Sequence, residues 1–253
     1  MMRRYSVAVV VVMGVLISCG AFWRVSDLAA GYVPTYPGAC LDPGHGGPGA
    51  CKWKPPCTNG DDAGSYGPPP EQLTEAWVNH AIVSLAKYDL EATGIRVQCT
   101  KDECTEEAIT QYVGPRTRAI IANGHSNVDV LISVHHQDIG IQKTEVFYAY
   151  KGDLYPETTW KYKLALGLAN EINRRFGYGM QVKDDRYSFL GSLDVLQEAW
   201  MPAALIEGSD IGFPEEEALM AYDYYHRLDE ADGIRDGFFA YADTFICPQN
   251  FDC

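Results

Sequence analysis

Short apolar segments alternate with amphipathic helical segments along most of the 253-residue chain, and this alternation constrains the fold more than any other feature. The apolar segments are rich in β-branched residues and short enough to be strands. Strands that are separated by helices form mostly parallel sheets covered by helices. We therefore predict an α/β fold in which a mostly parallel central sheet is flanked by helices. The predicted strands span residues 39–43, 95–99, 129–134, 144–150 and 203–207.

The helical segments have clear start and stop residues. We predict helices over 74–94, 116–124 and 158–177, with Thr74 as an N-cap and glycines at two of the ends. No second linker interrupts the pattern, so a single domain is expected over residues 36–253. Residues 46–70 are rich in glycine and proline, which predicts a long loop that acts as a functional flap insertion.

The first thirty residues resemble an export segment. Arg3 and Arg4 precede an uncharged apolar run over 7–17, as in a secretory signal peptide. The segment "LISC" also resembles a lipoprotein cleavage site, which would leave Cys19 lipidated at the new N-terminus. Cleavage near "DLAA" and an uncleaved anchor are the alternatives. Each places the folded domain outside the cytoplasm: in the periplasm, in the cell envelope or secreted.

Cysteine content and charge agree with that compartment. Eight cysteines are typical of a protein with disulfides, and 51–57, 99–104 and 247–253 are near enough in sequence to pair. Cys40 would then be buried and free if Cys19 is lipidated. A structural zinc site is the alternative, but no CxxC pair occurs. The net charge of -14 would repel nucleic acid and anionic membranes, so any membrane association is expected only through an N-terminal lipid or anchor.

Chemically reactive side chains follow the predicted strands. His45 comes after the first strand, His135 and His136 end the third, Glu207 ends the fifth, and Glu75 opens the first long helix. Parallel strand ends meet at one edge of a sheet, where two imidazoles and a carboxylate would form a hydrolytic zinc site. A separate carboxylate could then move the proton of water. Strand alternation allows only one of the adjacent histidines to face the site, and Glu75 could instead serve the helix dipole.

Four segments, taken in order, carry a family resemblance. The segments are "LDPGHGG", "LTEAWVNHAI", "RTRAIIAN…VDVLISVHH" and "MPAALIEGSDIGFPEEEAL". Together they resemble the zinc-dependent N-acetylmuramoyl-L-alanine amidases of the amidase-3 type over about residues 39–220. The resemblance implies zinc ligands at His45, Glu75 and His135 and a catalytic carboxylate at Glu207.

The resemblance also suggests supporting residues and shows departures. Asp42 is expected to orient the His45 ring, and Arg118 and Asn123 match a helix that we expect to be scaffold. The segment "SVHHQD" lacks the alanine and asparagine of the family's "SIHAN"-like strand end. Extra residues precede "GF" in "GSDIGF", and the 46–70 loop is longer than usual for the family. These departures concern the surroundings of the site and the substrate specificity.

The resemblance implies an amidase that cuts peptidoglycan between N-acetylmuramic acid and L-alanine. We expect the protein to be a monomer. Two alternatives are an inactive wall-binding homologue and a zinc amidase or peptidase that acts on another extracellular amide. The remaining histidines, His80, His125 and His226, have no motif context and are expected to be surface or packing residues.

Overall fold

The computed structural model describes residues 36–48, 50–53, 64–69, 72–104, 106–138 and 144–246. The described part of the fold belongs to one compact unit, Pro37–Cys253. The predicted export segment at 1–30, with Cys19, lies outside the described residues. Among the described residues, no helix is long and apolar enough to cross a membrane.

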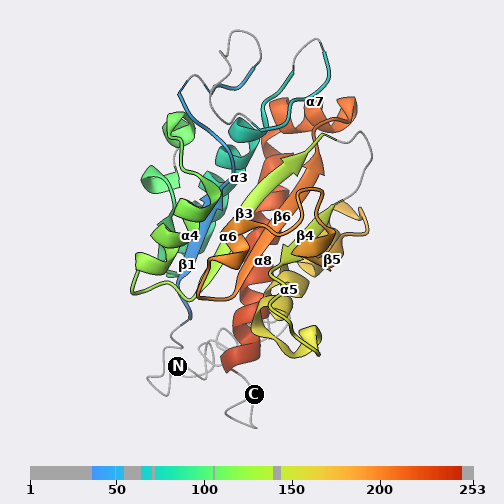
Figure 1. The fold of residues 1–253 in the computed structure, drawn as a ribbon. Helices are drawn as coiled ribbons and strands as arrows, with labels where there is room; N and C mark the ends of the chain where they lie inside the picture. Colours follow the sequence, from blue (N-terminus) through green and yellow to red (C-terminus); the bar gives the residue numbers. More distant parts are fainter. Residues whose placement is uncertain are drawn as a thin grey trace, which may run out of the picture. The chain divides into compact units, whose positions relative to one another are not determined.

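The sheet has six strands in the order β2-β1-β3-β6-β4-β5 (Figure 1). The first four in this order are parallel, whereas β4 is antiparallel to β6 and parallel to β5. The predicted α/β fold with a mostly parallel sheet is therefore confirmed. Five strands lie at the predicted positions, and the short, partly exposed edge strand β5 was missed. The strands are β1 Ala39–Pro43, β2 Val97–Cys99, β3 Val130–Gln137, β4 Glu145–Tyr148, β5 Gln181–Asp184 and β6 Ala203–Asp210.

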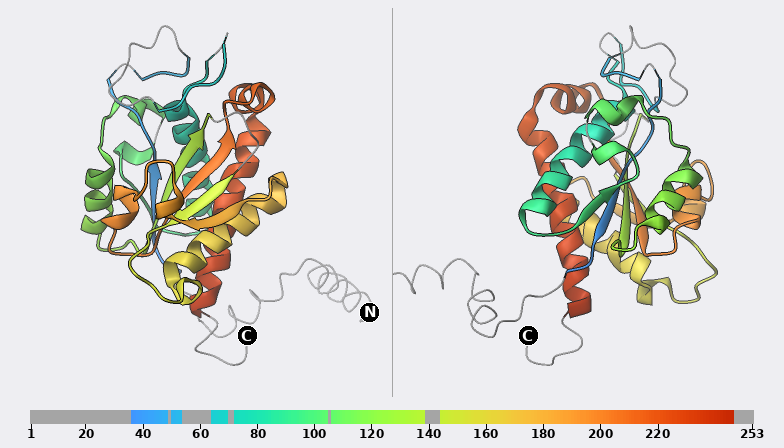
Figure 2. Two further views of the ribbon diagram at one scale, coloured as in Figure 1. Left: turned by 45° about the vertical axis from the view of Figure 1, so that its right-hand side comes forward. Right: turned by 90° about the vertical axis from the view of Figure 1, so that its left-hand side faces the viewer.

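Helices cover both faces of this sheet. The three long helices α3, α5 and α8 pack on one face, and α4 and α6 pack on the other (Figure 2). The three predicted helices match α3, α4 and α5 within two residues, whereas α8 was not predicted. The helices are α3 Glu75–Ala92, α4 Pro115–Gly124, α5 Trp160–Phe176, α6 Asp194–Gln197, α7 Pro214–Tyr222 and α8 Tyr224–Ile246, with 3-10 turns η1 Asp102–Cys104, η2 Glu106–Thr110, η3 Pro156–Thr158 and η4 Asp185–Tyr187.

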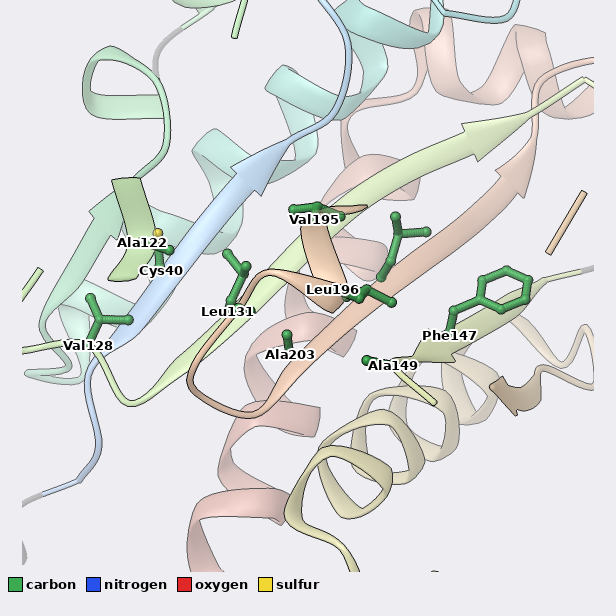
Figure 3. Close-up of a cluster of buried hydrophobic side chains, with 11 residues drawn as sticks. Cys40, Ala122, Val128, Leu131, Phe147, Ala149, Val195, Leu196 and Ala203 are labelled. Carbon is green, nitrogen blue, oxygen red and sulfur yellow. The ribbon is translucent and has the colours of Figure 1, made fainter. Parts of the chain in front are cut away.

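A cluster of small and aliphatic side chains fills the space between the sheet and the α4–α6 face. Leu131 of β3 lies near Leu196 of α6, and Cys40 of β1 lies near Ala122 of α4 (Figure 3). Leu205 of β6 belongs to the same cluster. Cys40 is fully buried and free, as predicted. Burial, followed by the nearby charge of Asp42, raises the pKa of the Cys40 thiol far above its usual range. This thiol is therefore a packing residue.

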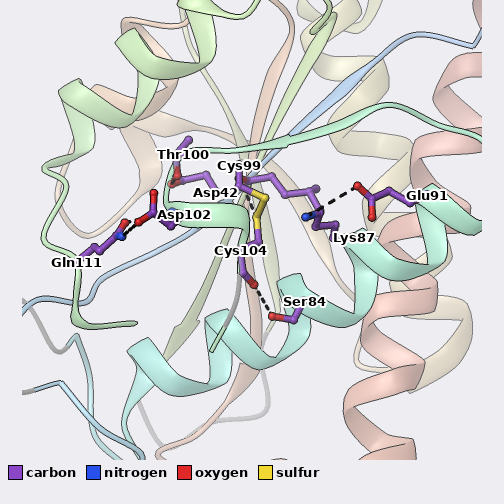
Figure 4. The surroundings of a disulfide bond; sticks show 10 residues. Asp42, Ser84, Lys87, Glu91, Cys99, Thr100, Asp102, Cys104 and Gln111 are labelled. Carbon is purple, nitrogen blue, oxygen red and sulfur yellow. Dashed lines mark hydrogen bonds and ion pairs between the residues drawn. A yellow bond between two sulfur atoms is a disulfide. The ribbon is translucent and has the colours of Figure 1, made fainter. Parts of the chain in front are cut away.

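A disulfide joins the end of β2 to η1. Cys99 and Cys104 are bonded as predicted, and the hydroxyl of Ser84 on α3 donates to the carbonyl of Cys104 (Figure 4). Cys51 is also disulfide-bonded. Its predicted partner Cys57 and the predicted 247–253 pair lie outside the described residues. The disulfide thus joins β2 to η1, and the Ser84 hydrogen bond joins η1 to the first long helix.

Candidate metal centre and active site

His45 lies in the turn that leaves β1, and the turn holds it in an unusual conformation. Its φ of 57° lies in the left-handed region that non-glycine residues seldom adopt. The ammonium group of Lys101 donates to the carbonyl oxygen of His45 and so helps to fix this turn. A Cβ atom on Gly44 would lie 2.3 Å from the ring of His135, so the close approach of the two motifs requires glycine here.

Glu75 is the first residue of α3. Thr74 caps the helix, since its hydroxyl accepts a hydrogen bond from the amide of Trp77 at 3.4 Å. The Glu75 residue is only 3% exposed, and Oε1 lies 3.2 Å from Nε2 of His45 and 3.0 Å from Nδ1 of His135. The helix start therefore directs this carboxylate at both imidazoles, rather than leaving it at the surface beside the helix dipole.

His135 lies on β3, next to His136. Its ring meets the His45 ring edge-on, with the ring centroids 4.7 Å apart. One ring nitrogen, Nδ1, faces Glu75, and the other, Nε2, is buried without a hydrogen-bond partner among the described residues. The side chain of His136 meets Asn79 and Glu230 instead of Glu75, as strand alternation requires. Of the two adjacent histidines, the structure thus brings the side chain of His135 to this site.

The three side chains together have the donor set of a metal site. One potential ligand atom from each of His45, Glu75 and His135 lies within 4.8 Å of the others. Two imidazole nitrogens and a carboxylate oxygen are the protein ligands of catalytic zinc sites, which leave a fourth position for water or substrate. The residues present therefore fit a zinc ion, although each comes from a different part of the fold.

Electrostatics favours the ligand forms of His135 and Glu75. Burial lowers the pKa of His135 to about 4, against the opposing effect of Glu75, so its imidazole is neutral near pH 7. Burial alone would raise the pKa of Glu75. The charge of His45 and hydrogen bonds from the two imidazoles outweigh burial and hold the pKa of Glu75 well below its usual value. A neutral imidazole and an ionised carboxylate are the states that bind metal.

Glu207 lies on β6 directly across from His135 on β3 and from Glu145 on β4. Residues paired across neighbouring strands project from the same face, so Glu207 shares the face that carries His135. Burial, followed by the negative charge of Glu75, raises the pKa of the Glu207 carboxyl well above its usual value. A cation bound nearby would lower the pKa of Glu207. Glu207 is thus a carboxyl on the same face as the candidate ligand His135, with a raised pKa.

Asp42 does not take the place that we expected for it, beside the His45 ring. It lies two residues after Cys40 on β1, so its side chain projects from the same face, toward α4. There the carboxylate accepts hydrogen bonds from Arg118 at 3.0 Å and Ser133 at 2.6 Å, and from Thr100. The expected contact with His45 is corrected to a buried network that joins β1, β3, α4 and the segment after β2.

Arg118 and Asn123 lie on α4, away from the three candidate ligands. Arg118 is 2% exposed and pairs with Asp42, whereas Asn123 donates to the carbonyl of Glu198 and accepts from the amide of Trp200, both at 2.9 Å. These contacts hold α4 against the sheet and against the segment that leads into β6.

Sequence reasoning missed Asn79, which lies one helical turn after Glu75. Its amide nitrogen donates to the carbonyl of Gly44 at 3.0 Å and lies 3.5 Å from Oε1 of Glu75. The spacing of four residues places both side chains on one face of α3, and this spacing could have revealed Asn79.

The described part of the 46–70 loop also reaches the site. The amide of Ser65 donates to Oε2 of Glu75 at 2.8 Å, and Glu75 returns a backbone hydrogen bond to Ser65 at 3.0 Å. A Cβ atom on Gly64 would lie 2.5 Å from Oε2 of Glu75 and 2.8 Å from the His45 ring. The loop therefore packs directly against two of the three candidate ligands.

The other histidines lie outside the site. His80 is buried on α3, its Nδ1 lies 2.8 Å from the carbonyl of Ala76, and burial lowers its pKa to about 3. His226 pairs with Glu216 at 2.6 Å, and His125 follows the end of α4. These positions suit packing and local structure.

A pair of imidazoles and a carboxylate at the edge of a mostly parallel sheet, beside the half-buried Glu207, defines a candidate metal-dependent hydrolase. The family model for N-acetylmuramoyl-L-alanine amidase, Amidase_3, matches residues 39–237. The chain belongs to this family, which confirms the resemblance. The protein is therefore a hydrolase of the bacterial cell wall, acting as an N-acetylmuramoyl-L-alanine amidase.

Solved structures share the fold at low sequence identity. An N-acetylmuramoyl-L-alanine amidase from Clostridium difficile 630 is 23% identical with a TM-score of 0.63, and covers 83% of this chain and 99% of its own. AmiC2 of Nostoc punctiforme is 22% identical with a TM-score of 0.61, and the match covers 83% of this chain and 98% of AmiC2. The catalytic domain of CwlV from Bacillus (Paenibacillus) polymyxa var. colistinus is 20% identical with a TM-score of 0.62. The match covers 82% of this chain and 98% of the CwlV domain. No curated protein sequence matches the chain.

Proposed function

We propose that this amidase is zinc-dependent and that His45, Glu75 and His135 hold the ion. The single observation that carries the proposal is the convergence of their ligand atoms to within 4.8 Å, from three separate parts of the chain. The substrate bond is the amide between N-acetylmuramic acid and the L-alanine of the stem peptide in peptidoglycan. Zinc, when bound, supplies a Lewis acid and activates water for attack on the amide carbonyl.

The chain's own residues perform the proton transfer and the positioning. Glu207 takes the proton of the attacking water and delivers it to the departing amine of L-alanine, which needs a carboxyl whose pKa is raised toward neutrality. The turn around His45, held by Lys101, and the cap of α3 keep two ligands in place before substrate arrives. The described edge of the 46–70 loop, at Gly64 and Ser65, lies next to these ligands and would border the bound peptide.

We propose that the enzyme works as a monomer outside the cytoplasm, with residues 36–253 as its catalytic domain. The compact unit Pro37–Cys253, the disulfide Cys99–Cys104 and the cell-wall substrate of the family support this placement. The basic, apolar N-terminus and "LISC" support export with lipid attachment at Cys19, or a signal peptide that is removed.

Product analysis tests the proposed reaction. Purified full-length protein, loaded with zinc, is incubated with peptidoglycan, and the new end groups are identified by mass spectrometry. We expect free L-alanine amines and glycan chains that keep the lactyl group. A different new amine would identify an amidase or peptidase for another bond, and binding without any new amine would identify a wall-binding protein.

A further inference from the structure

A buried polar network lies on the side of β3 that faces away from the candidate ligands. The ring of His136 is its centre, with Nδ1 2.7 Å from the side-chain oxygen of Asn79 and Nε2 3.1 and 3.3 Å from the two carboxyl oxygens of Glu230. Asn79, Glu230 and His136 are at most 1% exposed. Burying polar side chains is costly unless they are hydrogen-bonded, and here both ring nitrogens of His136 have a hydrogen-bond partner within the cluster.

The hydrogen bonds of this network have a fixed direction. Because the amide nitrogen of Asn79 donates to the carbonyl of Gly44, its oxygen must be the acceptor. Nδ1 of His136 is therefore the donor to Asn79. The opposite orientation of the Asn79 amide would set two oxygen acceptors against each other. Helix α8, through Glu230, thus orients the His136 ring, and the ring orients the Asn79 amide.

The network reaches the candidate metal site at two points. The Asn79 amide nitrogen holds the carbonyl of Gly44, the residue before His45, and lies 3.5 Å from Oε1 of Glu75. The backbone amide of His136 donates to the same oxygen of Glu75 at 3.2 Å. Two candidate ligands are therefore supported from one buried cluster.

Two departures from the family pattern meet in this cluster. The first is His136, where the family's strand end has alanine. The second is the extra length after Glu207, which forms a bulge: β3 advances from His135 to Gln137 while β6 advances from Glu207 to Asp210. The two departures lie in neighbouring strands. One begins directly after His135, and the other begins directly after Glu207, which is paired with His135.

The bulge is shaped to admit the Glu230 carboxyl. A Cβ atom on Gly208 would lie 2.2 Å from an oxygen of Glu230 and 2.9 Å from Nε2 of His136, so a larger residue here would displace the Glu230 carboxyl from its present position. The hydroxyl of Ser209 donates to Glu230 at 3.2 Å. Gly208 and Ser209, which belong to the extra length after Glu207, therefore make room for and bind Glu230, the partner of His136.

We propose that His136, Asn79 and Glu230 are positioning residues for the metal centre of this enzyme. They fix the first turn of α3 and the turn after β1, so that the donor atoms of Glu75 and His45 are preorganised for the ion. The inference rests on the proposed zinc site. Groups that orient metal ligands are typically worth 10- to 100-fold in metal affinity or activity.

The test measures metal binding by full-length protein with zinc and cobalt ions as probes. Glu230→Gln keeps the side-chain volume but cannot present two acceptors, and Asn79→Ala removes the link to Gly44. We expect each variant to bind zinc about 10- to 100-fold more weakly, in competition with a chromophoric chelator, and to change the visible spectrum of bound cobalt. Ile172→Ala, in the core of α5, is the control: it should lower the melting temperature without changing either metal readout.

Folded Glu230→Gln and Asn79→Ala proteins with native zinc affinity and native cobalt spectra would overturn the inference and leave the proposed zinc site intact. Because Glu230→Gln preserves shape, it decides the question alone if Asn79→Ala does not fold. Native protein that fails to bind zinc through His45 would overturn both proposals.

Discussion

Oε1 of Glu75 lies 3.0 Å from Nδ1 of His135, although the two residues are 60 positions apart in the sequence. The same oxygen lies 3.2 Å from Nε2 of His45. A short distance between a buried carboxylate and two imidazoles, all aimed at one point, is the geometry from which the proposed chemistry follows.

Zinc should stabilise the folded protein through these three side chains. A ligand that binds only the native state raises the melting temperature, and above Kd the stabilisation grows with the logarithm of the ligand concentration. We expect such a rise for native protein, its removal by a chelator, and its loss in His45→Ala. His80→Ala is the matched control, because His80 is a buried histidine without a place in the site. An undiminished zinc response in His45→Ala would exclude His45 as a ligand.

Glu207→Gln should separate proton transfer from metal binding. The amide keeps the size of the side chain but cannot take a proton from water, so we expect kcat to fall by about 10²- to 10⁴-fold. Zinc content, measured by atomic emission on the purified variant, should stay native because Glu207 is not among the three grouped ligands. Full cleavage of muropeptides by this variant would refute the assigned base.

Gly44→Ala should disturb the site without changing any ligand. The new Cβ atom would lie 2.3 Å from the His135 ring, so the ring or the turn must shift. We expect about 1–3 kcal/mol of destabilisation in urea and weaker zinc binding. Gly124→Ala provides the comparison, since a Cβ there meets no atom within 4 Å. Equal behaviour of the two variants would show that the contact with His135 is unimportant.

The Asp42–Arg118 pair should make stability depend on acid pH. Burial alone would raise the pKa of Asp42, but Arg118 and the hydroxyls of Ser133 and Thr100 outweigh burial and lower it. The unfolded chain, with a pKa of about 3.9, then takes up the proton first as pH falls. The stabilising contribution is present above that value and is lost as pH falls through the lowered folded-state pKa.

Urea unfolding midpoints, measured from neutral to acid pH, test whether stability falls as Asp42 is protonated. Asp42→Asn should lose part of the acid dependence. Because Arg118 then stays buried without its partner, the free energy of unfolding at pH 7 should also fall by about 3–5 kcal/mol. An Asp42→Asn protein as stable as the native one would contradict this account.

The sequence by itself determined most of the strands, three of the helices and the family. Apolar runs, helix caps and glycine stops are local features, so they located β1, β3, β6 and the helices α3, α4 and α5 within a few residues. The order of four motifs then indicated the amidase family and the candidate ligands.

Only the tertiary structure decided the contacts between distant residues. It gave β4 its antiparallel direction and turned Asp42 toward Arg118 instead of His45. It also brought His136 to Glu230, 94 positions away in the sequence. A local pattern specifies which face a side chain occupies, but its partner depends on how separate elements pack, and that packing is a property of the whole chain.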